Sequence, residues 1–176
     1  KHRSGSENVH FLQLDLASLD SVREFSKKFH SLESKLDILM NNAGVFGLPR
    51  TLTKDGFEMH MGVNHLAHFL LTNLLLDLLK ASAPSRVVNV SSKLHNNGKI
   101  LKDDLMMEKS YGSWAGYANS KIANIFHAVA LTKRLKGTNV TINSCHPGVV
   151  RTEIGRHTSI THSLLLVLLY PIYKNV

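Results

Sequence analysis

Short apolar runs alternate along this chain with longer segments of helical periodicity, and this alternation restricts the fold more than any other feature of the sequence. The apolar runs are Val9–Leu16, Leu36–Met40, Arg86–Val90 and Val140–Cys145. Each run has the length of a strand and is separated from the next by a helical pattern, which is typical of β-α-β units. The sequence therefore predicts an α/β fold with a parallel sheet and crossover helices.

Three helical patterns connect the predicted strands. The first follows Ser18, which can cap its start, and runs to about Phe29. The second covers Gly56–Lys80, and its apolar residues extend so far round the helix that we expect burial on two sides or a subunit interface. The third covers Tyr117–Leu135 and is followed by Gly137, a residue suited to ending a helix.

Composition and charge narrow the function classes. Lysine and arginine number 21 against 13 aspartate and glutamate, which gives a formal net charge of +8. These basic residues are scattered and are not interleaved with aromatic residues, so we expect no nucleic-acid partner. Cys145 is the only cysteine and cannot close an internal disulfide, which favours an intracellular fold. His65 and His68 share a predicted helix face but lack a third ligand, so we expect no metal site.

Neither end of the chain predicts a membrane-spanning helix. The apolar run Leu164–Tyr170 falls far short of the ~20 residues that such a helix needs. The run is still suited to lying on a membrane surface or covering a substrate pocket. At the other end, Lys1 stands in place of a methionine and a polar stretch follows, so we expect part of the fold to lie upstream of this sequence.

A tyrosine and a lysine on one predicted helix are candidates for acid–base chemistry. Tyr117 and Lys121 are four residues apart, so both project from the same helix face. A free tyrosine titrates near pH ~10 and transfers protons poorly at neutral pH. A cation at ~4 Å favours the phenolate by up to ~4 kcal/mol at an effective dielectric constant of ~20, which is enough to bring the pKa toward working pH. The spacing alone is weak evidence, because a tyrosine and a lysine at this spacing usually form an ordinary surface contact.

Polar residues follow each predicted strand at its carboxyl end. They are Asp15, the stretch Asn41 to Gly44, the pair Ser91 and Ser92, and Pro147 with Gly148. In an open parallel sheet this edge is where ligands bind. One such end can be a helix cap or a turn. Four in succession, together with Tyr117 and Lys121, favour a functional site.

Taken in order, these motifs resemble those of a known family. The residues that carry the resemblance are Asn41 to Gly44, Asn64, Ser92, Tyr117 with Lys121, and Pro147-Gly148 with Thr152. Over about residues 8–157 they are similar to the signature of the short-chain dehydrogenase/reductase family. Within it the chain looks most like the retinol dehydrogenase group, on residues 55–58, 63–66, 83–86 and 146–148 and on the 25-residue spacing from Ser92 to Tyr117.

The resemblance implies a Rossmann-like, doubly wound parallel sheet with strand order 3-2-1-4-5-6, extended by a further strand. Residues 1–176 would then form a single incomplete dinucleotide-binding and catalytic domain, which lacks the first two strands and the glycine-rich turn that holds the pyrophosphate. The residues that separate NAD from NADP also lie in the missing part. Only the likeness to the retinol dehydrogenase group therefore favours NADP(H) over NAD(H).

The resemblance also implies roles for four catalytic residues. Tyr117 would act as the general acid in carbonyl reduction and as the base in alcohol oxidation. Ser92, with Ser91 as the weaker candidate, would hold the substrate oxygen against the phenol. Lys121 would hold the nicotinamide ribose and lower the tyrosine pKa. Asn64 would anchor a water that joins Lys121 to solvent.

Cofactor-binding residues follow from the same resemblance. Tyr117 and Lys121 would contact the nicotinamide riboside. The other implied residues are Asp15 at the adenine, Asn42, Ala43 and Gly44 along the cleft, and Gly148, Val150 and Thr152 at the nicotinamide and its carboxamide.

The implied function is hydride transfer between a nicotinamide cofactor and a small lipophilic alcohol or aldehyde such as retinol or retinal. We expect the 176 residues alone to be inactive. The alternative is a non-catalytic truncated product that acts through protein contacts. Homodimer formation through the long helices is a further expectation. Association with a membrane surface, such as that of the endoplasmic reticulum, is another, with the anchor outside this chain.

Overall fold

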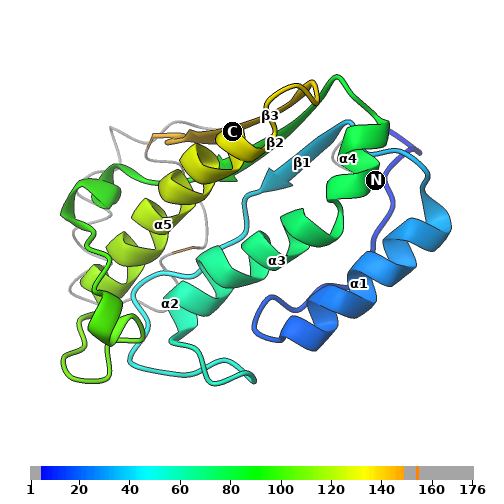
Figure 1. Ribbon diagram of the computed structural model, residues 1–176. Helices are drawn as coiled ribbons and strands as arrows, with labels where there is room; N and C mark the ends of the chain where they lie inside the picture. Colours follow the sequence, from blue (N-terminus) through cyan, green and yellow to red (C-terminus); the bar gives the residue numbers. More distant parts are fainter. Residues whose placement is uncertain (1–4, 149–153, 155–176) are drawn as a thin grey trace.

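The fold is built on a small parallel sheet. The computed structural model describes residues 5–148 and residue 154. Strands β1 (Ile38–Asn41), β2 (Ser85–Val90) and β3 (Val140–Cys145) lie in the order β1-β2-β3 and all run parallel. Figure 1 shows helices α1 (Leu19–Leu32), α3 (Ala67–Leu74) and α5 (Ser113–Arg134) side by side along one face of this sheet. The predicted α/β class with a parallel sheet is confirmed.

The main core lies between the sheet and the helices that cover it. Val87 of β2 is fully buried and lies opposite Ile142 of β3 in the parallel register. The side chains that pack against them come from α4 (Leu76–Ala81), from α5 and the residue that follows it, and from the start of β3: Leu79, Ala128, Leu131, Leu135 and Val140. A slip of one residue in the register would turn Val87 and Ile142 out of this core. The packing therefore fixes the carboxyl ends of β2 and β3 relative to α5.

A second apolar cluster joins α1 to α3. Val22 of α1 is fully buried against Ala67 and Leu71 of α3 and against Leu75 just beyond it. Ser18 caps α1, because its hydroxyl accepts a hydrogen bond from the backbone N–H of Ser21 at 3.4 Å. The first predicted helix is confirmed, including its cap.

The second predicted helix is interrupted. It consists of α2 (Met59–Met61), a π-helical turn (Gly62–Leu66), α3 and α4. It begins at Met59 because the Glu58 side chain accepts hydrogen bonds from the first free N–H groups. Apolar periodicity does not reveal the extra residue that a π-helical turn accommodates. Such turns occur frequently at functional sites, and this one carries Asn64.

The segment Val9–Leu16 is not a strand, and this prediction was wrong. Its residues form no ladder with another strand in the described part of the chain. Leu14 and Leu16 instead pack against the α1–α3 cluster, while Phe11 is 89% exposed. A strand needs a hydrogen-bonding neighbour, and within the described residues β1 pairs with β2 and not with Val9–Leu16.

Helix α5 is the longest helix of the described residues. It starts at Ser113, four residues before Tyr117, and Gly137 follows its end with a positive φ of 85°. Within residues 5–148, no helix has both the length and the apolar character needed to cross a membrane.

Candidate active site

Tyr117 lies near the start of α5, enclosed by an aromatic ring and an ammonium group. Its side chain is buried. The ring of Phe46, from the loop after β1, packs edge-on against it at 4.8 Å between ring centroids. One turn further along α5, Lys121 places Nζ 5.4 Å from the centroid of the phenol ring. The phenol and the ammonium therefore share one side of the helix.

Burial dominates the electrostatics of this pair. It raises the pKa of Tyr117, while the side chain of Ser92 acts in the opposite direction. It lowers the pKa of Lys121 to about 8, although Nζ donates a hydrogen bond to the carbonyl of Val90 at 2.9 Å. The expected lowering of the tyrosine pKa by Lys121 is not found in the chain itself. The loss of water around the phenol outweighs the hydrogen bond with Ser92.

Ser91 and Ser92 follow β2 and face different partners. Ser91 is buried, and its hydroxyl donates to the backbone carbonyl of Lys121 at 2.9 Å, which ties β2 to α5. Ser92 is half-buried and begins a short 3₁₀ helix, where its Oγ accepts from the N–H of Leu94 at 3.2 Å. The Ser92 side chain also lies beside the phenol of Tyr117. The structure thus brings Ser92, rather than Ser91, to the tyrosine.

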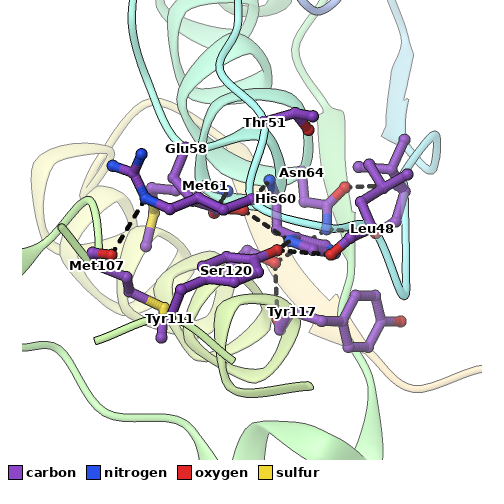
Figure 2. A network of polar contacts seen from close by, with 12 residues as sticks. Leu48, Thr51, Glu58, His60, Met61, Asn64, Met107, Tyr111, Tyr117 and Ser120 are labelled. Atoms are coloured by element: carbon purple, nitrogen blue, oxygen red, sulfur yellow. Dashed lines mark hydrogen bonds and ion pairs between the residues drawn. The ribbon is translucent and has the colours of Figure 1, made fainter. Parts of the chain in front are cut away.

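Asn64 joins the loop after β1 to α5 (Figure 2). It is fully buried in the π-helical turn. Its Nδ2 donates to the carbonyl of Val45 and to the hydroxyl of Ser120, each at 3.0 Å, and its Oδ1 accepts from the N–H of Val45 at 2.8 Å. The side chain therefore holds neighbouring segments together. The backbone carbonyl of Asn64 accepts a hydrogen bond from Nδ2 of Asn124 at 3.0 Å.

The loop after β1 comes close to both Asn64 and Lys121. A Cβ atom at Gly44 would lie 3.0 Å from Oδ1 of Asn64 and 3.6 Å from Nζ of Lys121. Glycine therefore permits the approach. Asn42 and Ala43 precede this point and are exposed. The loop thus offers exposed residues beside Lys121, which suits contact with an extended ligand.

Asp15 lies apart from this group of residues. Its carboxylate accepts hydrogen bonds from the N–H of Ala17 at 2.9 Å and from Nζ of Lys54 at 3.2 Å. Both contacts lower the pKa of Asp15, and the hydrogen bond from Ala17 has the larger effect. Among the described residues, none of its polar contacts reaches Asn64 or Tyr117.

The predicted residues after β3 are only partly covered by the structure. Gly148 is half-buried and has a positive φ of 86°, a conformation that glycine adopts without strain. Val150 and Thr152 lie outside the described residues.

Two further residues of the site were missed from the sequence. Asn124 donates from Nδ2 to the carbonyls of Asn64 at 3.0 Å and Val90 at 3.4 Å, so it shares an acceptor with Lys121. Its place three residues after Lys121, on the same helix face, was a usable signal. Phe46 follows Gly44 by two residues, and nothing in its sequence context marks it as a neighbour of Tyr117.

Three histidines lie buried or half-buried between the π-helical turn, α3 and α5. Burial lowers the pKa of His68 and that of His127 to about 4 each, and it also lowers the pKa of His65. These rings are therefore neutral at physiological pH. In the described part of the chain, no three histidine, cysteine or acidic side chains are grouped as metal ligands would be.

Comparison with known proteins now identifies the family. The sequence profile described as short chain dehydrogenase matches residues 1–162. The chain belongs to the short-chain dehydrogenase family. Retinol dehydrogenase 14 of Mus musculus is 60% identical over 148 residues, which cover 84% of this chain and 44% of that protein. The chain spans about half the length of the curated relatives it matches.

Solved structures place this short-chain dehydrogenase among Rossmann-like folds. A protein from Mycobacterium paratuberculosis is 36% identical and superposes with a TM-score of 0.74, covering 99% of this chain and 62% of that one. The complex of RhlG with NADP from Pseudomonas aeruginosa is 28% identical, with a TM-score of 0.64, and covers 83% of this chain and 55% of that one. The sheet and flanking helices described above agree with this fold.

The arrangement is suited to proton exchange with a bound oxygen atom. Tyr117 offers a phenol, Ser92 a hydroxyl beside it, and Lys121 a buried ammonium on the same side of α5. A hydroxyl and a phenol that converge in this way can hold a carbonyl or alcohol oxygen while a proton moves.

Proposed function

We propose that this chain supplies the catalytic part of an NADP(H)-dependent oxidoreductase, which interconverts a small lipophilic alcohol and its aldehyde. The observation that carries the proposal is the convergence of Ser92, Tyr117 and Lys121 beside the glycine loop after β1. Membership of the short-chain dehydrogenase family supports the reaction class. The names of the curated relatives, which are retinol dehydrogenases, support a retinol- or retinal-like substrate.

The residues of the loop after β1 fit an extended dinucleotide. Glycine at position 44 lets the loop lie close to the buried Lys121, where a ribose hydroxyl would bind, and Asn42 and Ala43 are exposed beside it. In the proposal Gly148, Val150 and Thr152 bind the nicotinamide end and Asp15 the adenine end. The bound nicotinamide supplies or accepts the hydride. NADP is proposed over NAD because the similar RhlG structure is an NADP complex.

Tyr117 moves the proton in the proposed reaction. During reduction its phenol gives a proton to the substrate oxygen, and during oxidation the phenolate takes the proton from the alcohol. Ser92 donates a hydrogen bond to that oxygen and keeps it within reach of the phenol. Lys121 favours the phenolate once a substrate and a cofactor ribose orient both groups. Asn64 anchors a water that joins Lys121 to solvent.

Aromatic residues beside the phenol support a lipophilic substrate. Phe46 packs edge-on against both Tyr117 and Trp114, with ring centroids 4.8 Å and 4.9 Å apart. These rings form an apolar wall next to the proton donor, which favours a flat hydrocarbon over a polar substrate.

A screen of NADPH oxidation over aldehydes tests the proposed function. The full-length protein is incubated with retinal, with long-chain aliphatic aldehydes and with short polar aldehydes. We expect turnover with the lipophilic aldehydes and much less with the polar ones. Failure to oxidise NADPH or NADH with any of these aldehydes would contradict the proposed reaction.

We also propose that residues 1–176 alone are inactive. One face of β1 supports this, because Ile38 and Met40 alternate with the more buried Leu39 and Asn41 and are 51% and 61% exposed on that face. In the described part of the chain nothing buries these apolar side chains, which calls for a further packing layer of the fold. Thermal unfolding and NADPH calorimetry of the isolated chain test the proposal. A cooperative melt with micromolar cofactor binding would contradict it.

The proposed assembly is a homodimer through the long helices. Phe69, Phe126 and Val129 project from α3 and α5 and are 44%, 51% and 53% exposed, which supports a partner on this face. Sedimentation of the full-length protein tests this. Membrane-surface association stays a prediction, since the run Leu164–Tyr170 lies outside the described residues.

A further inference from the structure

Glu58 and His60 form a buried pair that the proposed chemistry does not use (Figure 2). The two side chains are 1% and 0% exposed. Nδ1 of His60 and Oε1 of Glu58 are 2.7 Å apart. Burying a carboxylate is costly unless hydrogen bonds compensate for the lost water. A pair buried this completely therefore needs a structural or functional reason.

The carboxylate of Glu58 is fully compensated, and it fixes the start of α2. It accepts from the backbone N–H groups of His60 at 3.0 Å and Met61 at 2.8 Å, in addition to the imidazole. Burial alone would raise the pKa of Glu58, but these three hydrogen bonds lower it below its usual value. The helix that Glu58 starts continues into the π-helical turn with Asn64. The position of Asn64 therefore depends on this carboxylate.

The same pair lies directly against the first turns of α5. A Cβ atom at Gly116 would lie 3.2 Å from Nδ1 of His60 and 3.6 Å from the carboxyl carbon of Glu58. The next residue, Tyr117, has its ring centroid 6.4 Å from that of His60, with the two planes at 82°. Figure 2 shows the phenol pointing away from the pair, so contact is made through the ring edge and the backbone. The pair therefore contacts Tyr117 on the side opposite its hydroxyl group.

Tyr111 adds a third segment to this contact. Its phenol donates to the carbonyl of Leu48 at 2.7 Å and lies 3.4 Å from Nδ1 of His60. Burial, followed by the charge of Glu58, raises the pKa of Tyr111 to about 12, so this phenol stays neutral. His60 thereby meets the segment before α5 and α5 itself, and Tyr111 links it to the loop after β1. Capping of α2 alone would not require these additional contacts.

We propose that Glu58 and His60 are positioning residues for Tyr117, which hold the first turn of α5 so that the phenol keeps a fixed place relative to Ser92. The inference rests on the proposed function of Tyr117 as the proton donor. Neither Glu58 nor His60 touches the reacting atoms. They act by fixing where α5 begins relative to the turn that carries Asn64. Displacement of a catalytic group by about 1 Å can cost ~10²-fold in rate.

Substitutions of His60 in the full-length protein test the inference. His60→Leu keeps much of the volume but removes the donor to Glu58, whereas His60→Asn keeps an amide N–H at the place of Nδ1. We expect His60→Leu to lower kcat by ~10²-fold and to shift its pH profile, with cofactor Kd unchanged. His60→Asn should restore most of kcat. A purely structural role would lower the folded fraction without moving the pH profile.

A second variant tests the same contact without removing a polar group. Gly116→Ala places a methyl group against the fixed imidazole and should lower kcat while α5 stays helical, since alanine favours helices. Gly112→Ala is the matched control, because its Cβ would meet only Cβ of Ala115 at an ordinary 3.7 Å. If His60→Leu does not fold, Gly116→Ala decides the question.

The outcomes separate this inference from the proposed function. Wild-type turnover that Tyr117→Phe abolishes, together with losses in His60→Leu and Gly116→Ala, supports both. Wild-type kcat and pH profile in folded His60→Leu or Gly116→Ala overturn the positioning role alone. Full turnover in Tyr117→Phe, or none in the wild type, overturns the proposed function and this inference with it.

Discussion

The backbone of Gly44 lies against the side chain of Asn64, so closely that a methyl group on Gly44 would stand 3.0 Å from Oδ1. The same methyl group would lie 3.6 Å from Nζ of Lys121. Three segments far apart in sequence thus meet at one point: the loop after β1, the π-helical turn and α5. Glycine at position 44 is therefore a requirement of the packing as well as of the proposed cofactor cleft.

Gly44→Ala should accordingly impair both stability and cofactor binding. The added methyl group must displace Asn64 or Lys121, and overpacking of this kind costs ~1–3 kcal/mol of unfolding free energy. Urea unfolding and NADPH calorimetry of the full-length protein measure the two effects. The matched control is again Gly112→Ala, whose added methyl group meets no tight contact. Equal stability and affinity in both variants would show that the loop has room at Gly44.

Replacing Lys121 should stabilise the protein while abolishing its proposed function. Burial lowers the pKa of Lys121 to about 8 from an ordinary 10.5, so its charged form is disfavoured in the folded state. Lys121→Met removes the buried charge and should raise the unfolding free energy at neutral pH by on the order of 2 kcal/mol. Cofactor affinity and turnover should fall, because the ribose loses its partner.

The pH dependence of stability provides an independent check of Lys121. Between pH 8 and 10.5 the unfolded chain holds the lysine proton more tightly than the folded one, so wild-type stability should rise with pH across this window. Lys121→Met should lack that rise. A variant that is less stable than the wild type at neutral pH would contradict the buried, destabilising charge.

Acid should destabilise the protein through two buried histidines. His68 and His127 have pKa values lowered to about 4 from 6.5, so the unfolded chain binds protons first as the pH falls. The part of the unfolding free energy that depends on these two neutral rings is fully present above pH 6.5. It is lost as the pH falls toward 4. Replacing both by asparagine, which can keep the hydrogen bonds of Nδ1, should flatten this slope in urea unfolding at several pH values. An unchanged slope would assign acid sensitivity to other groups.

Much of the fold could be predicted because it depends on local patterns. The strand Val140–Cys145 has the predicted bounds, and α1 begins after its predicted cap, Ser18. Val9–Leu16 could not be assigned correctly, because an apolar run becomes a strand only where a neighbour offers hydrogen bonds. Periodicity alone was likewise insufficient to reveal the π-helical turn.

The site was predictable where chemistry follows spacing along the chain. The four-residue spacing of Tyr117 and Lys121 placed both groups on one side of α5. The direction of the tyrosine pKa was not predictable, since it depends on how deeply the phenol is buried. The contact of His60 with Gly116 joins residues 56 positions apart, and no pattern along the sequence indicates it.

Turnover of the Tyr117→Phe variant of the full-length protein tests the central claim most directly. The substitution keeps the ring that packs against Phe46 but removes the only proposed proton donor, so cofactor affinity should change little. NADPH oxidation with retinal or another lipophilic aldehyde should fall by ~10²–10⁴-fold, the range of general acid–base catalysis. Turnover close to that of the wild type would show that Tyr117 does not donate the proton.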